Sequence, residues 1–269
     1  MMPSPVEEPK KPKSNRRNGL YYFDTFPEGI LFDKNKGLPS VTTILGDTIA
    51  KPGLITWAAK LASRAALQDP SITEEQATSA IYEAKKEGGS RGGLVHSLTE
   101  AADNGHLADI ETLPPHIRPY ALAHQKFIKD FQPKLIKNEM VVANFTFGYA
   151  GQLDRIYDIR EDMDIVDFKT SPRYYKENGL QLSAYKHAEF VYDKINKVWS
   201  PMPKVHRTLV VLLGEDGTYT VKETDEPLEI FLALKKVYLW LNKEKLEKVK
   251  INKNARPKKK KGEINEPTD

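Results

Sequence analysis

Three side chains near the middle of the chain have the types and spacing that phosphodiester hydrolysis needs. Asp154 lies on one predicted strand, and Asp167 and Lys169 lie on the next strand after a tight turn. Two carboxylates can hold a hard divalent cation, which polarises a phosphate and acidifies a bound water molecule. A lysine beside them can offset the negative charge that develops during attack. The pattern therefore predicts a metal-dependent phosphodiesterase.

The alternation of side chains along a strand decides which of these residues can meet. Asp167 and Lys169 are two residues apart and point to the same face. Val166 and Phe168 point to the other face, where they fill the core. An aspartate and a lysine at a strand end are, taken alone, most simply a solvated ion pair. With Asp154 on the neighbouring strand, we expect the two acids and the lysine to converge on one patch.

A glutamine and a tyrosine follow these strands on a predicted helix. Gln181 and Tyr185 are four residues apart and therefore share one face of the helix. Tyr185 is most simply a core aromatic residue with a hydrogen-bonded hydroxyl. A glutamine on the buried stripe of a helix needs a partner. We therefore expect the Gln181 amide to orient the lysine, a metal-bound water molecule or a phosphate oxygen.

One of the six histidines has neighbours that suggest a ligand. His96 follows Arg91-Gly92-Gly93, where the sequence predicts that a helix begins. Glycines allow a backbone to approach closely, and the N-terminus of a helix attracts phosphate. Glu100 lies one turn after His96, and it is expected either to support the histidine or to be solvated.

The first half of the chain is predicted to be largely helical. The sequence indicates a hairpin over 21–32 and a helix that opens after Pro39-Ser40. A capping box at 71–74 should begin another helix, which ends at Gly88-Gly89. We expect residues 20–133 to form an N-terminal helical region that contributes to the active site.

The second half of the chain changes to the pattern of strands. Segments 135–145, 151–159 and 163–169 are short, β-branched and separated by turn residues, as in an antiparallel meander. After the helix of Gln181, the predicted order is a strand over 205–213, a strand over 218–223 and a long helix from Pro227 to about Lys248. Strands between flanking helices imply an α/β fold with a mixed central sheet covered on both faces. Residues 134–250 are expected to form this core.

Composition excludes several classes of protein. The chain has 269 residues and no cysteine, which excludes disulfides, thiolate zinc sites and cysteine-held iron–sulfur clusters. No apolar run approaches the ~20 residues of a membrane span, and the first residues lack the apolar region of a secretory signal. We therefore expect a cytoplasmic protein that has no membrane partner.

The net charge of +4 comes from the two ends of the chain. Residues 1–19 carry five Lys or Arg against two acids, and residues 251–269 carry six against three. The part between them has 30 basic and 32 acidic residues. Both ends are expected to be disordered basic tails, because they cannot bury enough apolar surface to fold. The RPKKKK run at 256–261 could attract a polyanion, or it could simply keep the chain in solution.

Taken together, these motifs resemble the RecB-like branch of the PD-(D/E)XK nuclease superfamily. That branch has a helical histidine, a strand glutamate, G-x-x-D, D-x-K and Q-x-x-x-Y in this order, and here they correspond to His96, Glu139, Gly151 with Asp154, Asp167 with Lys169, and Gln181 with Tyr185. The resemblance implies a restriction-endonuclease-like core. It also implies that His96, Asp154, Asp167 and the Phe168 carbonyl bind Mg²⁺ or Mn²⁺, and that Lys169 activates or positions the water. Glu139 is expected to be a structural residue rather than a ligand.

A second likeness covers the N-terminal half, which resembles the mitochondrial genome maintenance exonucleases and related phage exonucleases. It rests on the segments LPSVTTIL at 38–45 and LITW at 54–57 and on the G-x-x-x-H helix, and it spans about 38–190. This likeness implies that the substrate is single-stranded DNA or a DNA end. The residues then expected to contact DNA are Ser40, Thr42, Arg91, Gln181 and Tyr185.

The sequence thus favours a metal-dependent DNA exonuclease that works in replication, recombination or repair, in the host cytoplasm if a phage encodes it. One alternative within the same class is a structure-specific endonuclease. A second is a DNA-binding module without catalytic activity, and a third is a structural α/β protein in which the D-x-K triplet arises by chance.

Overall fold

The structure is a computed structural model, and it describes residues 16–243 and residue 246. The elements are, in chain order, β1(Arg16–Arg17), β2(Leu20–Tyr21), β3(Leu38–Pro39), α1(Val41–Thr48), α2(Pro52–Gln68), α3(Glu74–Asp103), the 3₁₀ turn η1(Ile110–Thr112), α4(Arg118–Phe131), β4(Lys134–Asn144), β5(Tyr149–Ile159), β6(Asp162–Lys169), α5(Lys176–Lys186), β7(Phe190–Asp193), β8(Val198–Pro201), β9(Arg207–Leu213), β10(Tyr219–Thr224) and α6(Leu228–Leu241).

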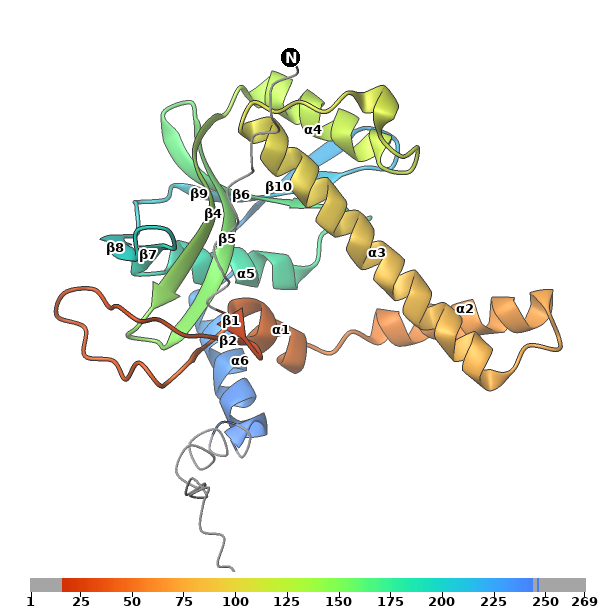
Figure 1. Ribbon diagram of the computed structural model, residues 1–269, viewed down its shortest axis with the longest axis horizontal. Coiled ribbons are helices and arrows are strands. Elements are labelled where there is room, and N and C mark those ends of the chain that lie inside the picture. The colour runs from red at the N-terminus through yellow and green to blue at the C-terminus, as the bar shows by residue number, and fades with distance from the viewer. Residues whose placement is uncertain (1–15, 244–245, 247–269) are drawn as a thin grey trace, which may run out of the picture.

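A seven-stranded mixed sheet forms the centre of the fold (Figure 1). Its strand order is β10-β9-β6-β5-β4-β7-β8. Strands β4, β5 and β6 form an antiparallel meander, and β9 pairs with β6 in parallel after the crossover through α5. The predicted α/β class with a mixed sheet is therefore confirmed. The edge hairpin of β7 and β8 was not predicted from the sequence.

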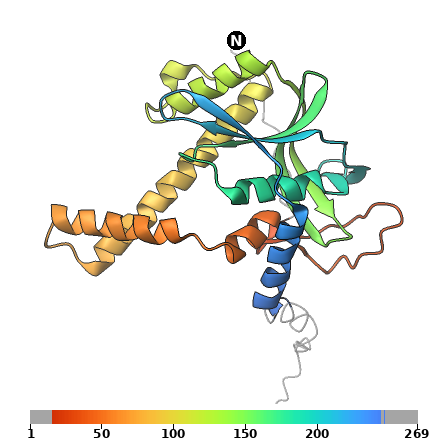
Figure 2. The ribbon, with the colours of Figure 1, turned by 180° about the vertical axis from the view of Figure 1, so that it is seen from behind.

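Helices cover both faces of the sheet (Figure 2). One core cluster joins the sheet to α1, α5 and α6 and contains Ile165 of β6. A second cluster joins the sheet to α3 and α4 and contains Val166 and Phe168 of the same strand. The alternation expected for β6 is thus confirmed. Among the described residues, no helix has both the length and the apolar character that a bilayer crossing requires.

Helix α3 runs without a break through the glycines that were expected to end it. Thr73 caps its start, and its hydroxyl accepts a hydrogen bond from the Gln76 N–H while the Gln76 side chain accepts one from the Thr73 N–H. Each helical glycine costs only about 1 kcal/mol, and packing near both ends of α3 offsets that cost. The predicted helix start near Arg91 is therefore wrong. Gly92-Gly93 lies inside a helix and offers no N-terminus to a phosphate.

Helix α2 and the first part of α3 project from the body of the molecule as a two-helix arm (Figure 1). No residue of α2 is buried, and α2 packs against α3. Lys51, which caps the start of α2, forms a 2.8 Å ion pair with Glu177 at the start of α5. The arm is therefore attached to the body at both ends.

The N-terminal segment differs from its prediction in two ways. Strand β2 pairs with β1 on one side and with β3 on the other, so the hairpin expected over 21–32 is wrong. Arg16 and Arg17 form β1, although they fall in the tail that was expected to be disordered. The rest of that tail, 1–15, and the predicted tail 251–269 lie outside the described residues, as does most of the predicted helix beyond residue 243.

A buried ion pair links α3 to the sheet. The side chains of Arg155 on β5 and Asp103 at the end of α3 are only 1% and 2% exposed, and Arg155 Nε donates to the Asp103 carboxylate. Arg155 also donates to the Thr99 hydroxyl at 2.7 Å and lies 4.9 Å from the centre of the Phe168 ring. On α4, His124 Nε2 is 3.5 Å from the other Asp103 oxygen. This cluster fixes α3 and α4 to β5.

The stability of the cluster can be tested with Asp103→Ala. The substitution leaves the Arg155 charge buried without its partner, so we expect the free energy of unfolding to fall by about 3–5 kcal/mol in a urea titration. Glu111→Ala is the matched control, because it removes the exposed ion pair of Glu111 with Arg118 and should cost less than about 1 kcal/mol. Equal losses in the two variants would show that the buried pair does not hold α3 on the sheet.

Candidate active site

The carboxylates of Asp154 and Asp167 lie where β5 and β6 stop pairing. The last pair of this ladder is Arg155 with Val166, so the two acids are the next residues on their strands, and their carboxyl groups are close enough to share a hydrogen bond. Lys169 Nζ lies 3.0 Å from Asp167 Oδ1 and 2.9 Å from Oδ2. The structure therefore brings both acids and the lysine together.

Strand β5 reaches α3 with two consecutive side chains. Leu153 and Ile156 belong to the same core cluster although they are three residues apart, so the alternation of the strand is interrupted between them. As a result Asp154 contacts His96 of α3, and its neighbour Arg155 contacts the last turns of the same helix. The irregularity places Asp154 in the site and Arg155 in the buried ion pair that holds α3 on the sheet.

His96 lies between two carboxylates. Its Nε2 is 3.2 Å from Glu139 Oε1 and 3.4 Å from Asp154 Oδ2. One ligand atom from each of these three residues lies within 4.8 Å of the other two. Glu139 has a positive φ of 51°, which a glutamate rarely adopts, and such strained conformations concentrate at functional sites. The structure thus adds Glu139 to the site, although the sequence predicted only a structural role for it.

The site carries more negative than positive charge. Burial raises the pKa of Asp167 to about 7, and the charge of Asp154 adds to the rise although Lys169 opposes it. Burial also disfavours ionisation of Asp154, but the hydrogen bond from His96 and the charge of Lys169 outweigh it and lower this pKa to about 2. The hydrogen bond to Asp154 raises the pKa of His96, and burial raises that of Glu139. These opposed shifts are typical of groups that share one charged site.

The donor set fits a hard divalent cation. Carboxylate oxygens with one imidazole suit Mg²⁺ or Mn²⁺. Asp167 Oδ2 is buried and, although it is close to Lys169, makes no hydrogen bond of good geometry. The surplus of carboxylates around His96 and this unsatisfied oxygen are both features that a bound cation would compensate.

Gln181 and Tyr185 support the site from α5. Gln181 Nε2 donates to the Tyr185 hydroxyl at 3.1 Å, so its amide binds the tyrosine in this structure. The Tyr185 ring is 1% exposed and packs against Gly151 of β5 so closely that a Cβ at this position would collide with it. Burial raises the pKa of Tyr185, and the charge of Asp154 adds to the rise. The glycine of the G-x-x-D motif therefore lets the tyrosine approach the acid.

The other predicted site residues lie in different surroundings. The Phe168 side chain fills the core between the sheet and α4, and a role for its carbonyl stays a prediction. Ser40 is buried at the start of α1, bridges to Ala150 of β5 and shares a 3.0 Å hydrogen bond with Thr42. The Arg91 guanidinium lies 3.7 Å from the carboxylate of Glu215, after the end of β9. The DNA contacts predicted for Ser40, Thr42 and Arg91 stay predictions.

Two further residues at the site were missed from the sequence. Gln152 donates to Glu139 and accepts a 3.2 Å hydrogen bond from Lys194. Tyr21 of β2 is buried and close enough to Glu139 for the carboxylate charge to influence its pKa, which burial chiefly raises. Strand alternation could have placed Gln152 on the face of Asp154, because the two residues are two apart on β5, whereas no spacing along the chain relates Tyr21 to the acids. For Glu139 a signal did exist, because it immediately precedes the apolar run MVVA of its strand.

The role of Glu139 can be tested by titrating Mn²⁺ into the Glu139→Gln variant and following free Mn²⁺ by electron paramagnetic resonance. Loss of one carboxylate charge from the site should weaken Mn²⁺ binding at least about ten-fold, as removal of even supporting groups does at metal sites. Glu223→Gln, on the exposed edge strand β10, is the control and should bind as the parent does. Unchanged binding in Glu139→Gln would return Glu139 to a purely structural role.

Comparison of the chain with protein-family models found no matching family, and comparison with curated proteins found no significant match.

Proposed function

We propose that this protein is a DNA exonuclease that depends on Mg²⁺ or Mn²⁺ and has a restriction-endonuclease-like core of the PD-(D/E)XK type. The observation that carries the proposal is the meeting of Asp154, Asp167 and Lys169 at the end of the β5–β6 ladder. His96 and Glu139 complete the acid cluster from a helix and a neighbouring strand. A structural protein has no need to gather one buried and two partly buried carboxylates around so few cations.

The order of the elements supports the assignment to this superfamily. The histidine lies on α3, the glutamate on β4, the G-x-x-D acid on β5, the D-x-K pair on β6 and the Q-x-x-x-Y pair on α5. This is the order in which the RecB-like branch carries its motifs. The close contact of Gly151 with Tyr185 joins the G-x-x-D motif to the Q-x-x-x-Y motif.

The side chains divide the work of hydrolysis among them. A divalent ion held by His96, Glu139, Asp154 and Asp167 would polarise the phosphate and acidify a water molecule. Lys169 is held as a cation, because Asp167 and Asp154 outweigh the burial that would lower its pKa. Its charge offsets the negative charge that develops on the phosphate oxygens.

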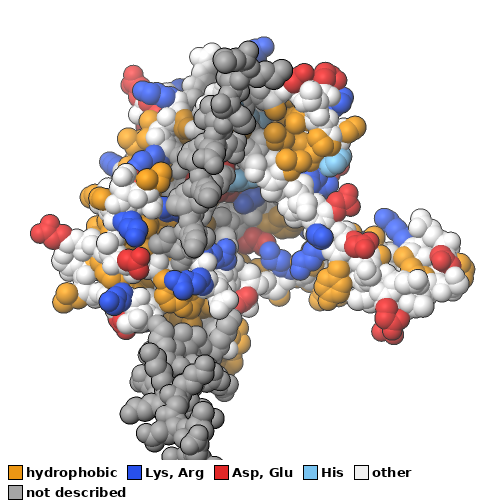
Figure 3. Space-filling view, viewed as in Figure 1, with side chains coloured by type: hydrophobic (Ala, Val, Ile, Leu, Met, Phe, Trp, Pro, Cys, Tyr) orange, Lys and Arg blue, Asp and Glu red, His pale blue; other side chains and the backbone are white. Residues whose placement is uncertain are grey.

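Surfaces beside the site suit a strand of nucleic acid. A cleft of about 510 Å³ adjoins Glu139 between β4 and the end of β7, and Lys137 and Lys194 line it together with the acids Glu100 and Asp193. The arm exposes aromatic side chains, Trp57 on α2 and Tyr82 on α3, on which bases can stack. Figure 3 shows basic and acidic side chains gathered where the arm leaves the body. These features favour single-stranded DNA or DNA ends as the partner, in the cytoplasm of the cell or of the phage host.

Two substitutions test the chemistry. Lys169→Met and Asp167→Asn should each lower Mg²⁺-dependent cleavage of an end-labelled single strand at least about 100-fold, because the first removes the cation that offsets charge on the phosphate and the second removes a carboxylate that would hold the metal. Lys222→Met and Asp225→Asn make the same changes at exposed positions of the β10 region and should cleave normally. Melting temperatures of all four variants check the fold. Undiminished cleavage by both site variants would refute the assignment.

A comparison of linear and circular single-stranded DNA separates the exonuclease from the structure-specific endonuclease. An exonuclease needs a free end, so we expect linear strands to be degraded in Mg²⁺ and circles of the same sequence to survive. Rapid cutting of circles would favour the endonuclease. If the protein bound both substrates but cleaved neither with Mg²⁺ or Mn²⁺, it would be a DNA-binding module without catalytic activity.

A further inference from the structure

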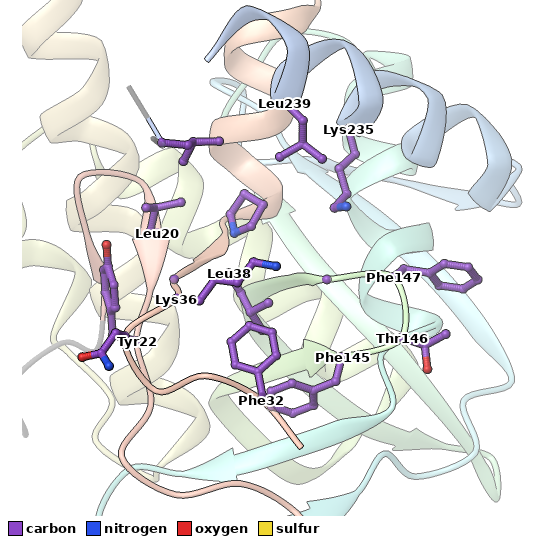
Figure 4. A pocket seen from close by; sticks show the side chains of 15 residues that line it. Leu20, Tyr22, Phe32, Lys36, Leu38, Phe145, Thr146, Phe147, Lys235 and Leu239 are labelled. Atoms are coloured by element: carbon purple, nitrogen blue, oxygen red, sulfur yellow. The ribbon is translucent and has the colours of Figure 1, made fainter. Parts of the chain in front are cut away.

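A second cavity lies at the far end of the β4–β5 hairpin from the acid cluster. Its volume is about 390 Å³, within the range of small-molecule sites. The turn Phe145–Gly148 forms one side, the N-terminal segment around Lys36 forms another, and α6 closes the top with Lys235 and Leu239 (Figure 4). Asn144, at the end of β4, is five residues from Glu139, so at about 3.3 Å per residue the turn beside the cavity lies roughly 17 Å along the strand from this acid.

The walls of this cavity are mainly apolar and aromatic. Leu20, Leu38 and Leu239 contribute aliphatic surface, and the rings of Phe32 and Phe145 pack 5.5 Å apart. None of the described residues that line the cavity is acidic. A flat aromatic group would therefore find a matching surface here, and an anion would meet no repulsion from the wall.

Two lysine amines face this space from opposite sides. Lys235 reaches from α6 toward Gly148, where an added Cβ would lie 3.8 Å from its Nζ, and Lys36 lies over the Phe32 ring (Figure 4). Burial lowers the pKa of Lys235, and the charge of Lys36 lowers it further. Neither amine forms an ion pair with any acid in the described part of the chain. Two neighbouring cations without a counter-charge favour the binding of an anion.

We propose that this cavity binds a nucleoside monophosphate, with the phosphate between Lys36 and Lys235 and the base against Phe32 and the leucines. Two amines suit the double negative charge of a phosphate monoester, because lysine binds phosphate as a point charge. Inorganic phosphate alone would leave the apolar walls exposed to water. A base would cover them and should therefore add to the affinity. The site is separate from the acid cluster, and its occupation does not require the proposed nuclease activity.

Isothermal titration calorimetry of the full chain in EDTA tests this site with dAMP and dTMP as ligands. We expect one nucleotide to bind per chain, and deoxyadenosine or inorganic phosphate alone to bind at least ten-fold more weakly. Lys235→Met and Lys36→Met should each weaken nucleotide binding roughly ten-fold or more, because each removes a charge-assisted hydrogen bond. Lys236→Met and Lys34→Met, at exposed neighbouring positions, should bind as the parent does.

Two further variants keep the test decisive. Leu239→Trp fills the cavity from a partly exposed position of α6 without removing either amine, and it should abolish nucleotide binding while the protein stays folded. Asp167→Asn alters the acid cluster and should leave the binding unchanged. The proposal is overturned if neither nucleotide binds at millimolar concentration, if inorganic phosphate binds as tightly as dAMP, or if Asp167→Asn removes the binding that Lys235→Met leaves intact.

Discussion

A buried arginine on β5 sets the position of the helix that completes the acid cluster. Arg155 is almost fully removed from water, so its charge must be met by partners inside the protein. Those partners are Thr99 and Asp103, which follow His96 by one turn and two turns on α3. Satisfying Arg155 therefore brings His96 to the level of Asp154, the residue that precedes the arginine. The position of His96 in the site therefore depends on this link.

The cluster above that link is electrostatically incomplete. Glu139, Asp154 and Asp167 contribute three carboxyl groups, whereas His96 and Lys169 supply the cationic charge. Burial raises the pKa of Asp167, and the charge of Asp154 adds to the rise, whereas the hydrogen bond from His96 and the charge of Lys169 overcome burial and lower the pKa of Asp154. The unusual backbone of Glu139 adds strain at the same place. The divalent cation that we propose for this site would neutralise the surplus of carboxylates.

The β4–β5 hairpin connects two regions of opposite electrostatic character. Its middle carries the acids, which attract cations, and its turn borders a cavity in which Lys36 and Lys235 attract anions. The apolar residues of both strands lie in the core between helices, so the hairpin is a stiff connection.

The sequence by itself determined the class of fold, the meander and the residues at its end. The period of two in β6 was enough to place Asp167 and Lys169 on one face and Val166 with Phe168 on the other, because strand alternation is local. The order of β4, β5, β6, α5, β9, β10 and α6 was equally visible, since each of these elements shows its own periodicity. Short edge strands such as β7 and β8 were not predicted, because four residues carry too little pattern to distinguish a strand from a turn.

Only the tertiary structure decided how distant segments meet. Glu139 adopts a positive φ in the site, which the sequence did not predict although its strand was visible. Tyr21 comes near Glu139 because β2 lies beside the sheet, and nothing in the spacing of residues predicts that contact. The glycines at 88–89 and 92–93 looked like helix boundaries, yet α3 continues through them because the buried pair with Arg155 and the packing with α2 hold its two ends. Local propensity is worth about 1 kcal/mol per residue, and packing between elements exceeds it.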